Sequence, residues 1–414
     1  MSVDALRGFD MFWIIGADAL VYALHRMSAN PVTSTLADQL EHADWAGFHF
    51  YDLIFPLFVF LVGVSIVFSL GKNLEQGGRP AALRRVFRRF VLLFIIALIY
   101  SGGVTETWPN IRLLGVLNRL ALCYLFASLI FCFFRPRAIA ALCASLLIGY
   151  WALMTFIPIR DIRLESAALA ARAEAAGDPS TAKALRGQVN LSTVKNSPAW
   201  DVVEKMYAGT TTRVTGQYAQ GYNLANHLDF QFLPGKKWET FADPEGLLST
   251  LPAIASCLLG VFAGLLLRGP QWNDAQKVKC LLAGGAGAVV LGLLWSIQFP
   301  IVKKIWTSSF VLVAGGCSAI LLGVFYQVVD VWKKQSWCQP FVWMGMNSIT
   351  VYLASNFIGG FRKLGARLAG GDVRIFLDQH VAKGLGDLVI ALTGLALAFY
   401  FVRFLHRRKI FLRM

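Results

Sequence analysis

Long apolar runs separated by short polar segments recur along most of the chain. A helix that crosses about 30 Å of hydrocarbon needs roughly 20 residues, so each run predicts one membrane-spanning helix. The expected spans are 8–26, 50–71, 88–107, 114–134, 138–158, 246–267, 280–299, 306–330, 340–361 and 386–405. Runs of this length are typical of helices rather than of barrel strands. The pattern therefore predicts an all-α, polytopic transmembrane bundle of about ten spans.

Composition supports this fold class. Of 414 residues, 56% are hydrophobic and 15% are charged, and the mean hydropathy is +0.56, whereas soluble domains carry roughly 25% charged residues. We expect one transmembrane domain, 1–414, with a long periplasmic loop, 159–245, between the fifth and sixth spans. Within this loop, the Ala-rich segment 164–187 predicts helix. Segment 222–246 is dense in Asn, His, Asp, Trp and Glu and predicts a wall facing the substrate.

Basic residues concentrate in the loops on one side of the predicted bundle. They are Lys72, Arg79, Arg84, Arg85, Arg88, Arg89, Arg135, Arg137, Arg268, Lys277, Lys279, Lys333, Lys334, Arg403, Arg407, Arg408, Lys409 and Arg413. Cytoplasmic loops carry the excess of Lys and Arg, so we expect both termini in the cytoplasm and the protein in a bacterial inner membrane. Loop 362–385 disagrees, because it carries five basic residues on the expected outer side.

Charge and cysteine usage narrow the expected partners. The formal net charge of +15 suits anionic lipid headgroups, and no basic stripe with interleaved aromatic residues suggests nucleic acid. A cleavable signal is not expected, because the first apolar run contains Asp10 and Asp18. The seven cysteines lie in or beside predicted helices without metal-ligand spacing, so neither disulfides nor a metal site is predicted.

Polar side chains within the spans gather toward the predicted outer half. Ionisable groups in a membrane usually face an interior cavity, because lipid exposure is costly. The residues concerned are Asp10, Asp18, Asp52, Glu106, Asn118, Arg119, Lys303, Lys304, Trp306, Asn347 and Ser348. Asp10 and Asp18 are separated by about 80° around a helix and can border one face. We expect a polar cavity that opens outward and is closed below by the helices.

Such a cavity serves a transporter or an enzyme. Many transporters are built from internal repeats, and the two halves of this chain show no convincing repeat. An enzyme needs a positioned base or nucleophile, for which histidine is the usual choice near neutral pH. His42 lies beside Glu41 and Asp44 in the sequence, although a lone loop histidine is more often structural. The residues alone favour an enzyme slightly and leave both classes open.

Six segments carry a family resemblance. They are SVDALRGFDMFWIIG (2–16), HADWAGFHFYDLIFPLFVFLVGVS (42–65), IRLLGVLNRLALCYL (111–125), DPEGLLSTLPAIASCLLGVFAG (243–264), KKIWTSSFVL (303–312) and GMNSITVYL (345–353). In order and spacing they resemble the heparan-α-glucosaminide N-acetyltransferase family, in its shorter bacterial form. The resemblance implies a transmembrane enzyme that moves acetyl from cytosolic acetyl-CoA to the amine of a glucosamine-type sugar on the periplasmic side.

The resemblance also assigns roles to two residues. In that family the histidine of the H-A-x-W block is catalytic, so His42 is expected to act as a base or as an acetyl carrier. Asp18 stands where the family has an asparagine, and a carboxylate there is expected to orient or deprotonate His42. Ala46 also departs from the asparagine of the lysosomal form, which implies different substrate contacts.

The remaining candidates are assigned by their chemistry. Donors for the cofactor's phosphates or for a developing oxyanion are Arg119, Asn118, Lys303, Asn347 and Ser348, with Arg84, Arg85 and Arg88 on the inner face. Expected substrate contacts are Asp52, Asp243, Glu245 and Trp306, of which Asp243 and Glu245 are equally suited to cap the sixth helix. Expected partners are acetyl-CoA, an amino sugar, lipids and a second copy in a homodimer. The alternatives are an amino-sugar permease without chemistry and an O-acyltransferase acting on an envelope polysaccharide.

Overall fold

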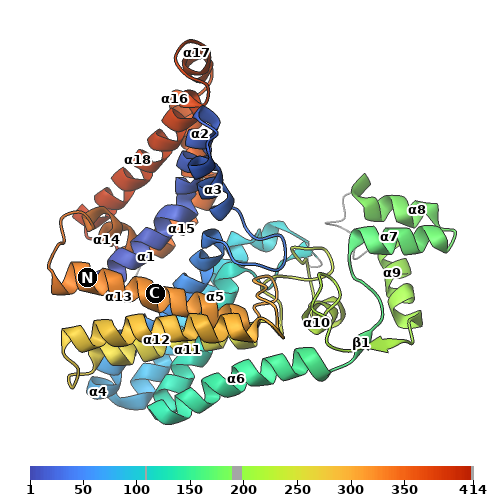
Figure 1. Ribbon diagram of the computed structural model, residues 1–414, viewed down its shortest axis with the longest axis horizontal. Coiled ribbons are helices and arrows are strands. Elements are labelled where there is room, and N and C mark those ends of the chain that lie inside the picture. Colours follow the sequence, from blue (N-terminus) through green and yellow to red (C-terminus); the bar gives the residue numbers. More distant parts are fainter. Residues whose placement is uncertain (108–109, 189–197, 412–414) are drawn as a thin grey trace.

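A computed structural model describes residues 1–107, 110–188 and 198–411. The first half contains α1 (Ser2–Phe12), η1 (Trp13–Ala17), α2 (Asp18–Met27), α3 (Pro31–Gln39), α4 (Phe50–Tyr100), η2 (Gly103–Thr105), α5 (Val116–Phe133), α6 (Pro136–Phe156), β1 (Ile159–Arg160), α7 (Ser166–Ala175), α8 (Pro179–Lys183), η4 (Ala184–Gln188) and α9 (Pro198–Gly209). The second half contains β2 (Arg213–Val214), α10 (Leu224–Phe232), α11 (Thr250–Arg268), α12 (Asp274–Trp295), α13 (Ser308–Phe325), η6 (Tyr326–Val331), α14 (Gln339–Met346), α15 (Ser348–Phe357), α16 (Phe361–Ala369), α17 (Asp372–His380) and α18 (Leu385–Arg407). The predicted helical fold is confirmed (Figure 1).

Seven helices of the described residues are long and apolar enough to cross a membrane. They are α4, α5, α6, α11, α12, α13 continued by η6, and α18. The longest, α4, is a hairpin, because the backbone turns at Gly78 (φ +68°, ψ −174°) before Pro80, and residues 51–58 and 97–101 line one cavity. Its two arms account for the predicted spans 50–71 and 88–107.

Two predicted spans are interrupted, so the expectation of continuous helices there is wrong. Span 8–26 contains the π-helical turn η1, where Gly16 adopts φ +116°, a conformation that side chains disfavour. Span 340–361 breaks at Asn347 (φ −118°, ψ 21°) between α14 and α15. Helix α13 begins at Ser308, so Trp306 lies in the turn before it rather than opening it.

The centre of the bundle consists of α4, α5, α11 and α13, whose long apolar segments are mostly buried, whereas α6 and α12 expose most of theirs. Small residues allow α4 and α11 to touch through their backbones. A Cβ atom at Gly63 would lie 1.9 Å from the carbonyl oxygen of Cys257, and one at Gly260 would lie 1.9 Å from that of Phe60. Such close approach is typical of helices that pack in membranes.

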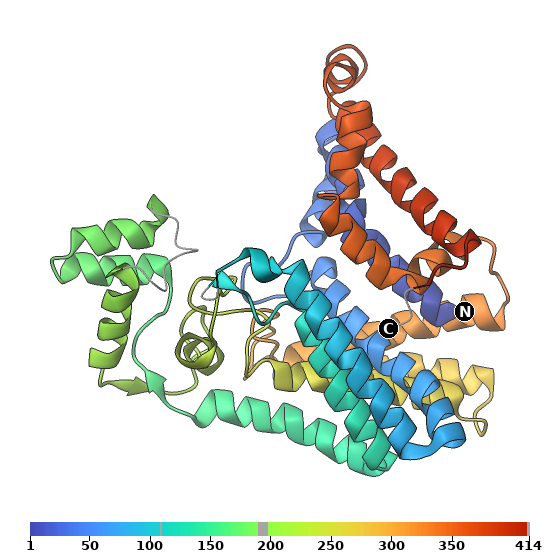
Figure 2. The same ribbon diagram turned by 180° about the vertical axis from the view of Figure 1, so that it is seen from behind.

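The long loop 159–245 forms a small helical unit beside the bundle. Its α7, α8, α9 and α10 enclose a hydrophobic cluster that includes Leu169, Trp200 and Phe230, and β1 pairs with β2 in antiparallel register. The helix predicted within 164–187 is confirmed by α7 and α8, while residues 189–197 of the loop lie outside the described residues. Figures 1 and 2 place α7–α9 at the opposite end of the molecule from Met1 and from the C-terminal end of α18.

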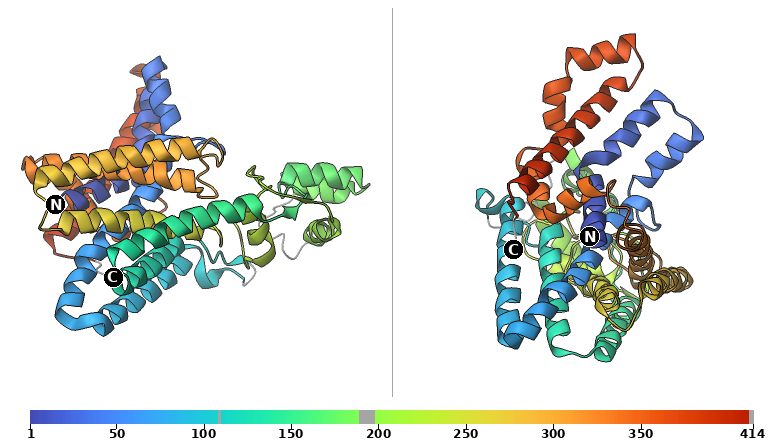
Figure 3. Two further views of the ribbon diagram at one scale, coloured as in Figure 1. Left: turned by 60° about the horizontal axis from the view of Figure 1, so that its bottom comes forward. Right: turned by 90° about the vertical axis from the view of Figure 1, so that its left-hand side faces the viewer.

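A second projection carries the basic loop 362–385. In Figure 3, α2 with α3 and α16 with α17 and α18 extend away from the bundle as two neighbouring arms. Helix α16 packs on α18, since a Cβ atom at Gly365 would lie 2.7 Å from the Ile390 carbonyl oxygen. The two arms are joined by an ion pair between Arg26 and Asp387.

Candidate functional site

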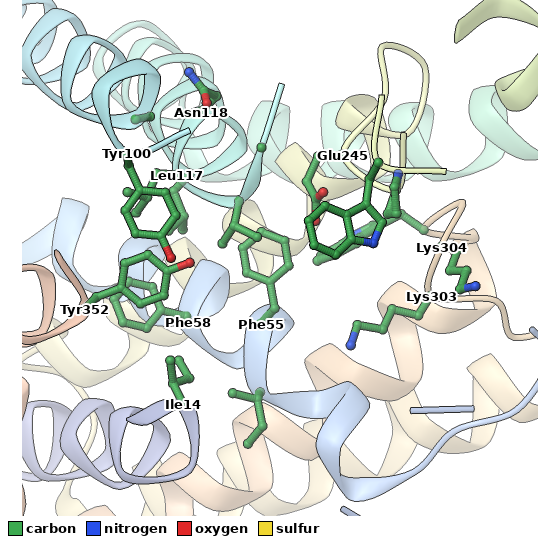
Figure 4. Close-up of a pocket in the computed structure, with 18 of the residues that line it drawn as sticks. Ile14, Phe55, Phe58, Tyr100, Leu117, Asn118, Glu245, Lys303, Lys304 and Tyr352 are labelled. Atoms are coloured by element: carbon green, nitrogen blue, oxygen red, sulfur yellow. The ribbon is translucent and has the colours of Figure 1, made fainter. Parts of the chain in front are cut away.

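A cavity of about 540 Å³ lies where both ends of α4 meet α5, α15 and the loops 300–307 and 238–245. Its lining is polar at one end and apolar at the other. In Figure 4, Glu245, Lys303 and Lys304 lie toward one end, whereas Ile14, Phe58, Tyr100 and Tyr352 lie toward the other. The rings of Tyr100 and Tyr352 stack with centroids 5.0 Å apart. A cavity of this kind can hold a ligand with an apolar arm and a polar reacting end.

The polar end contains a cluster of three charged or titratable groups. His42 Nδ1 lies 2.9 Å from Asp52 Oδ1. Lys303 Nζ lies 3.2 Å from the same carboxylate oxygen, 2.9 Å from Nδ1 and 3.3 Å from Nε2 of the imidazole. The His42 side chain is 51% exposed, while the Asp52 side chain is 1% exposed. The histidine is thus accessible from the cavity, and its partner carboxylate is buried beneath it.

Local structure holds these side chains in place. Asp52 lies in the first turn of α4, where its Oδ2 accepts the backbone N–H groups of His49 and Ala43 at 3.1 and 3.2 Å. Carboxylates are stabilised at this position of a helix. The loop carrying His42 is tied to the loop carrying Lys303, because the Gly47 N–H donates to the Ile301 carbonyl at 2.9 Å.

Hydrogen-bond partners indicate which ring nitrogen of His42 carries the proton. An ionised carboxylate only accepts hydrogen bonds, so the contact with Asp52 requires a proton on Nδ1. In the neutral ring, Nε2 then carries the lone pair, as in hydrolase triads, and the Lys303 ammonium 3.3 Å away can donate to it. Burial lowers the pKa of the Lys303 ammonium, and the Asp52 carboxylate opposes part of that shift.

A second network supports the wall of the cavity. Arg112 forms two hydrogen bonds with Asp243 at 2.8 and 2.7 Å and one with Glu245 at 2.6 Å. The Arg112 guanidinium lies over the Trp238 ring, 5.1 Å from its centroid. Behind this layer, Asp229 accepts the backbone N–H groups of Asp243 and Leu247 at 3.3 and 2.9 Å. These contacts hold the segment 238–247 rigidly against the bundle.

The structure brings seven of the predicted site residues to the cavity. They are His42, Asp52, Asn118, Glu245, Lys303, Trp306 and Ser348. Neither the side-chain oxygen nor the side-chain nitrogen of Asn118 has a partner within the described residues, although both atoms are buried. Buried polar atoms usually have hydrogen-bond partners, so the amide of Asn118 could bind a polar group of a ligand.

Four predicted site residues, Arg119, Asn347, Asp243 and Asp18, do not line the cavity. Arg119 is buried behind Trp306, with its guanidinium 5.0 Å from the indole centroid, and it donates to Ser249. Asn347 is buried at the break between α14 and α15. The Asp243 carboxylate accepts hydrogen bonds from Arg112, which does line the cavity. These three residues support the cavity lining from outside it.

The expectation that Asp18 lines the same cavity as His42 is wrong. Asp18 is absent from the lining and lies within electrostatic range of Tyr51, whose ring packs against the His42 ring with centroids 4.9 Å apart. The carboxylate that contacts His42 belongs to Asp52. The loop 40–49 turns the imidazole toward the start of α4 rather than toward the first helix.

Several residues that line the cavity individually carry no sequence signal of a site. Arg112, Trp238 and Glu239 lie in loops, where no periodicity marks a buried side chain, and Tyr100 and Tyr352 look like ordinary residues of apolar helices. The available signal was the expectation that 222–246 forms a wall, and Trp238, Glu239 and Glu245 do lie in that wall.

A second cavity, of about 520 Å³, lies at the bend of the α4 hairpin. It is lined by Asn73, Gln76, Gly77, Ala81, Arg84, Arg85, Arg88 and Arg89. The ends of α4 line the first cavity and its bend lines the second, so the two cavities lie at opposite ends of the hairpin. Four guanidinium groups in one cavity form a strongly anion-attracting site.

Known proteins resemble this chain. Residues 1–170 match the family described as heparan-alpha-glucosaminide N-acetyltransferase, catalytic. This is the family that the six segments of the sequence resemble. The heparan-alpha-glucosaminide N-acetyltransferase of Mus musculus is 27% identical over 295 residues, and that of Homo sapiens is 24% identical over 310 residues.

Both matches to these N-acetyltransferases cover 66% of this chain and 42% of the relative. The chain thus spans less than half the length of the curated relatives it matches. The matched residues 1–170 include His42 and Asp52, the whole α4 hairpin and Asn118. They contain every residue that lines the arginine-lined cavity, whereas Lys303, the third member of the cluster at the polar end, lies outside them.

Proposed function

We propose that this protein is a membrane-embedded N-acetyltransferase that transfers acetyl from acetyl-CoA to the amine of a glucosamine-type sugar. The observation that carries the proposal is the contact of His42 with Asp52 and Lys303 at the polar end of a cavity whose other end is apolar. The similarity to named N-acetyltransferases supports the same reaction class.

His42 performs the proton transfer in this proposal. Only a neutral amine attacks a thioester, and Nε2 is placed to remove a proton from the acceptor's amine. A positioned general base contributes about 10²–10⁴-fold. In the second route, Nε2 attacks the thioester first and carries the acetyl group until the amine displaces it. In both routes the CoA sulfur leaves and is protonated, and Asp52 stabilises the imidazolium by accepting from Nδ1–H.

Lys303 stabilises the developing negative charge in this proposal. A carbonyl attacked from Nε2 would bring its oxygen close to the Lys303 ammonium, which lies 3.3 Å from that nitrogen. Preorganised donors at such a position are often the largest single contribution to catalysis. This role suits Lys303 better than the expected phosphate contact, because Lys303 lines the cavity that contains His42 and not the arginine-lined one. Ser348 also lines this cavity, whereas Asn118 lies toward its other end, near Tyr100 and Leu117 (Figure 4).

The arginine-lined cavity would hold the phosphates of acetyl-CoA. Arg84, Arg85, Arg88 and Arg89 offer the forked donors that match phosphate oxygens. From Arg89 to Ala97, which lines the first cavity, α4 rises by about 12 Å. Arg89, which lines this cavity, lies over the Tyr124 ring of α5 at 4.8 Å from the centroid, and the buried hydroxyls of Tyr124 and Ser128 could contact the amides of the pantetheine arm.

The positions of the cavities support a reaction in which acetyl-CoA and the amino sugar bind on opposite sides of the membrane. The arginine-lined cavity would open on the cytoplasmic face of a bacterial inner membrane, where both termini would also lie. His42 and residues 159–245 would then face the periplasm and the amino sugar. Lipid contacts and a homodimer remain predictions of the same proposal.

His42→Ala tests the proposed reaction. In purified protein given acetyl-CoA and glucosamine, we expect this variant to lower kcat at least about 10²-fold, because the base is lost. Asp52→Asn should lower kcat about as strongly, since the Nδ1 proton is no longer fixed by a carboxylate. N-acetylglucosamine formation measured by mass spectrometry reports both effects.

Two matched variants serve as controls. His380→Ala changes an exposed histidine of α17, and Asp44→Asn neutralises an exposed carboxylate two residues from His42. Both should retain turnover close to that of the unsubstituted protein. Normal turnover in folded His42→Ala protein would remove the histidine from the mechanism.

A further inference from the structure

The mouth of the His42 cavity carries an exposed but immobilised tryptophan. Trp238 is 72% exposed, yet it lines the cavity. Its backbone N–H donates to Asp243 Oδ2 at 3.0 Å, which fixes the main chain below the ring. An aromatic ring held at the edge of a cavity offers a flat apolar face to a ligand.

One face of the Trp238 indole is already occupied. The Arg112 guanidinium covers it at 5.1 Å from the ring centroid. Arg112 is itself held by two hydrogen bonds to Asp243 and one to Glu245, so it cannot move aside. The guanidinium therefore sets the tilt of the indole and leaves the opposite face for another partner.

Hydrogen-bonding groups stand beside the indole at the same rim. Glu239, the next residue, forms an ion pair with Lys304 at 2.8 Å. The Lys304 ammonium also lies 5.9 Å from the centroid of the Trp45 ring, whose Nε1–H donates to the Tyr218 carbonyl. Both Glu239 and Lys304 line the cavity. The rim thus combines a flat apolar surface with a fixed acceptor and a fixed donor.

A pyranose ring has the complementary chemistry. Its axial C–H groups form an apolar face that packs on an aromatic ring, and its equatorial hydroxyls accept and donate hydrogen bonds. An acyclic amine has the reacting nitrogen but lacks such a face. The arrangement of Trp238, Glu239 and Lys304 accordingly selects for ring shape as well as for the amine.

We propose that Trp238 is the stacking platform for the acceptor's sugar ring, with Glu239 and Lys304 binding its hydroxyls, so that the amine points toward His42. This inference rests on the proposed function, because it names the place and the shape of the acceptor. It assigns selectivity for an amino-pyranose over an open-chain amine to one exposed indole.

Trp238→Ala should raise the KM for glucosamine about tenfold, since an aromatic contact of this kind is worth roughly one factor of ten in binding. The KM for acetyl-CoA and kcat at saturating sugar should change less than twofold. Trp238→Phe, which keeps an aromatic face, should recover most of the loss. With ethanolamine as the acceptor, Trp238→Ala should have no effect, because no ring is present to stack.

Phe232→Ala is the matched control, because Phe232 is 64% exposed, lies six residues away and does not line the cavity. Unchanged KM for glucosamine in Trp238→Ala, or an equal rise for ethanolamine, would overturn the inference. Saturation-transfer NMR of glucosamine with the full-length protein, without acetyl-CoA, separates this failure from that of the proposed function. Trp238-dependent sugar binding without acetyl transfer would refute the enzyme and keep the sugar site.

Discussion

At the scale of single residues, Asp229 is the carboxylate on which the cavity wall depends. It is 1% exposed, and both its oxygens accept backbone N–H groups from the segment that carries Asp243 and Glu245. Burial raises its pKa to about 7, and the two N–H contacts oppose part of that shift. Asp229 is therefore protonated in the folded protein at a pH where it would be ionised in the unfolded chain.

This difference predicts a pH-dependent stability. Between about pH 4 and pH 7 the folded state retains a proton that the unfolded state has released, so the free energy of unfolding falls as the pH rises. Asp229→Asn removes this contribution and also loses one N–H contact. The melting temperature of the detergent-solubilised variant should therefore lie below that of the unsubstituted protein at pH 4.5 and approach or exceed it at pH 7.5. Parallel curves would contradict the prediction.

The sequence predicts all three members of the cluster at the polar end as site residues, but it does not predict their contacts. His42, Asp52 and Lys303 were all candidates, but Asp52 was assigned to the substrate and Asp18 to the histidine. The error has a physical cause: which carboxylate meets an imidazole depends on how the loop 40–49 folds, and that loop carries no periodic pattern. Its path is set by contacts with the loop at Ile301, which is distant in the sequence.

At the scale of elements, the α4 hairpin connects the two cavities. The polar residues 72–89 extend both arms beyond the apolar runs, and the bend at Gly78 brings Arg84, Arg85, Arg88 and Arg89 around one cavity. Apolar runs predicted both arms, because lipid requires long continuous helices. They could not predict the interruptions at Gly16 and Asn347, which arise from single backbone conformations.

The hairpin is held by its packing on α11, which predicts that Gly260→Ala destabilises the protein. The new methyl group would meet the Phe60 carbonyl oxygen at 1.9 Å, and overpacking of this kind costs about 1–3 kcal/mol. The melting temperature in detergent should fall by several degrees. Gly284→Ala in α12 is the control, because its Cβ atom would meet open space and should leave the melting temperature unchanged or higher. Equal effects of the two substitutions would refute the proposed packing.

At the scale of the whole molecule, the two cavities lie at opposite ends of the α4 hairpin, and the proposed function assigns the phosphates of acetyl-CoA to one and the amino sugar to the other. The arginine-lined cavity lies at the bend of α4, and His42 lies near the unit formed by residues 159–245. Sequence patterns predict basic residues on one side of the bundle and polar residues on the other, and the two cavities are lined by these two groups of residues. They could not show that the two groups form cavities joined by one hairpin, because that depends on contacts between distant segments.

Because the two cavities are distinct, we expect that substitutions in the arginine-lined cavity weaken acetyl-CoA binding without impairing the transfer of acetyl at His42. Arg84→Gln combined with Arg85→Gln should raise the KM for acetyl-CoA about tenfold or more, because charge-assisted contacts with phosphate are lost. The KM for glucosamine should stay constant, and acetyl-pantetheine, which lacks the nucleotide, should be used equally well by both proteins. Arg79→Gln, an exposed arginine outside the cavity, is the control. A similar loss with acetyl-pantetheine would argue against a phosphate role.

Transfer of acetyl across a sealed membrane tests whether the donor and the acceptor bind on opposite sides of the protein. Vesicles containing the protein in one orientation, with the arginine-lined cavity inside, would receive labelled acetyl-CoA in the lumen and glucosamine outside. We expect labelled N-acetylglucosamine in the outer medium with the unsubstituted protein and none with His42→Ala. Unmodified glucosamine accumulating in the lumen, with no acetylated sugar on either side, would contradict the account and indicate a permease.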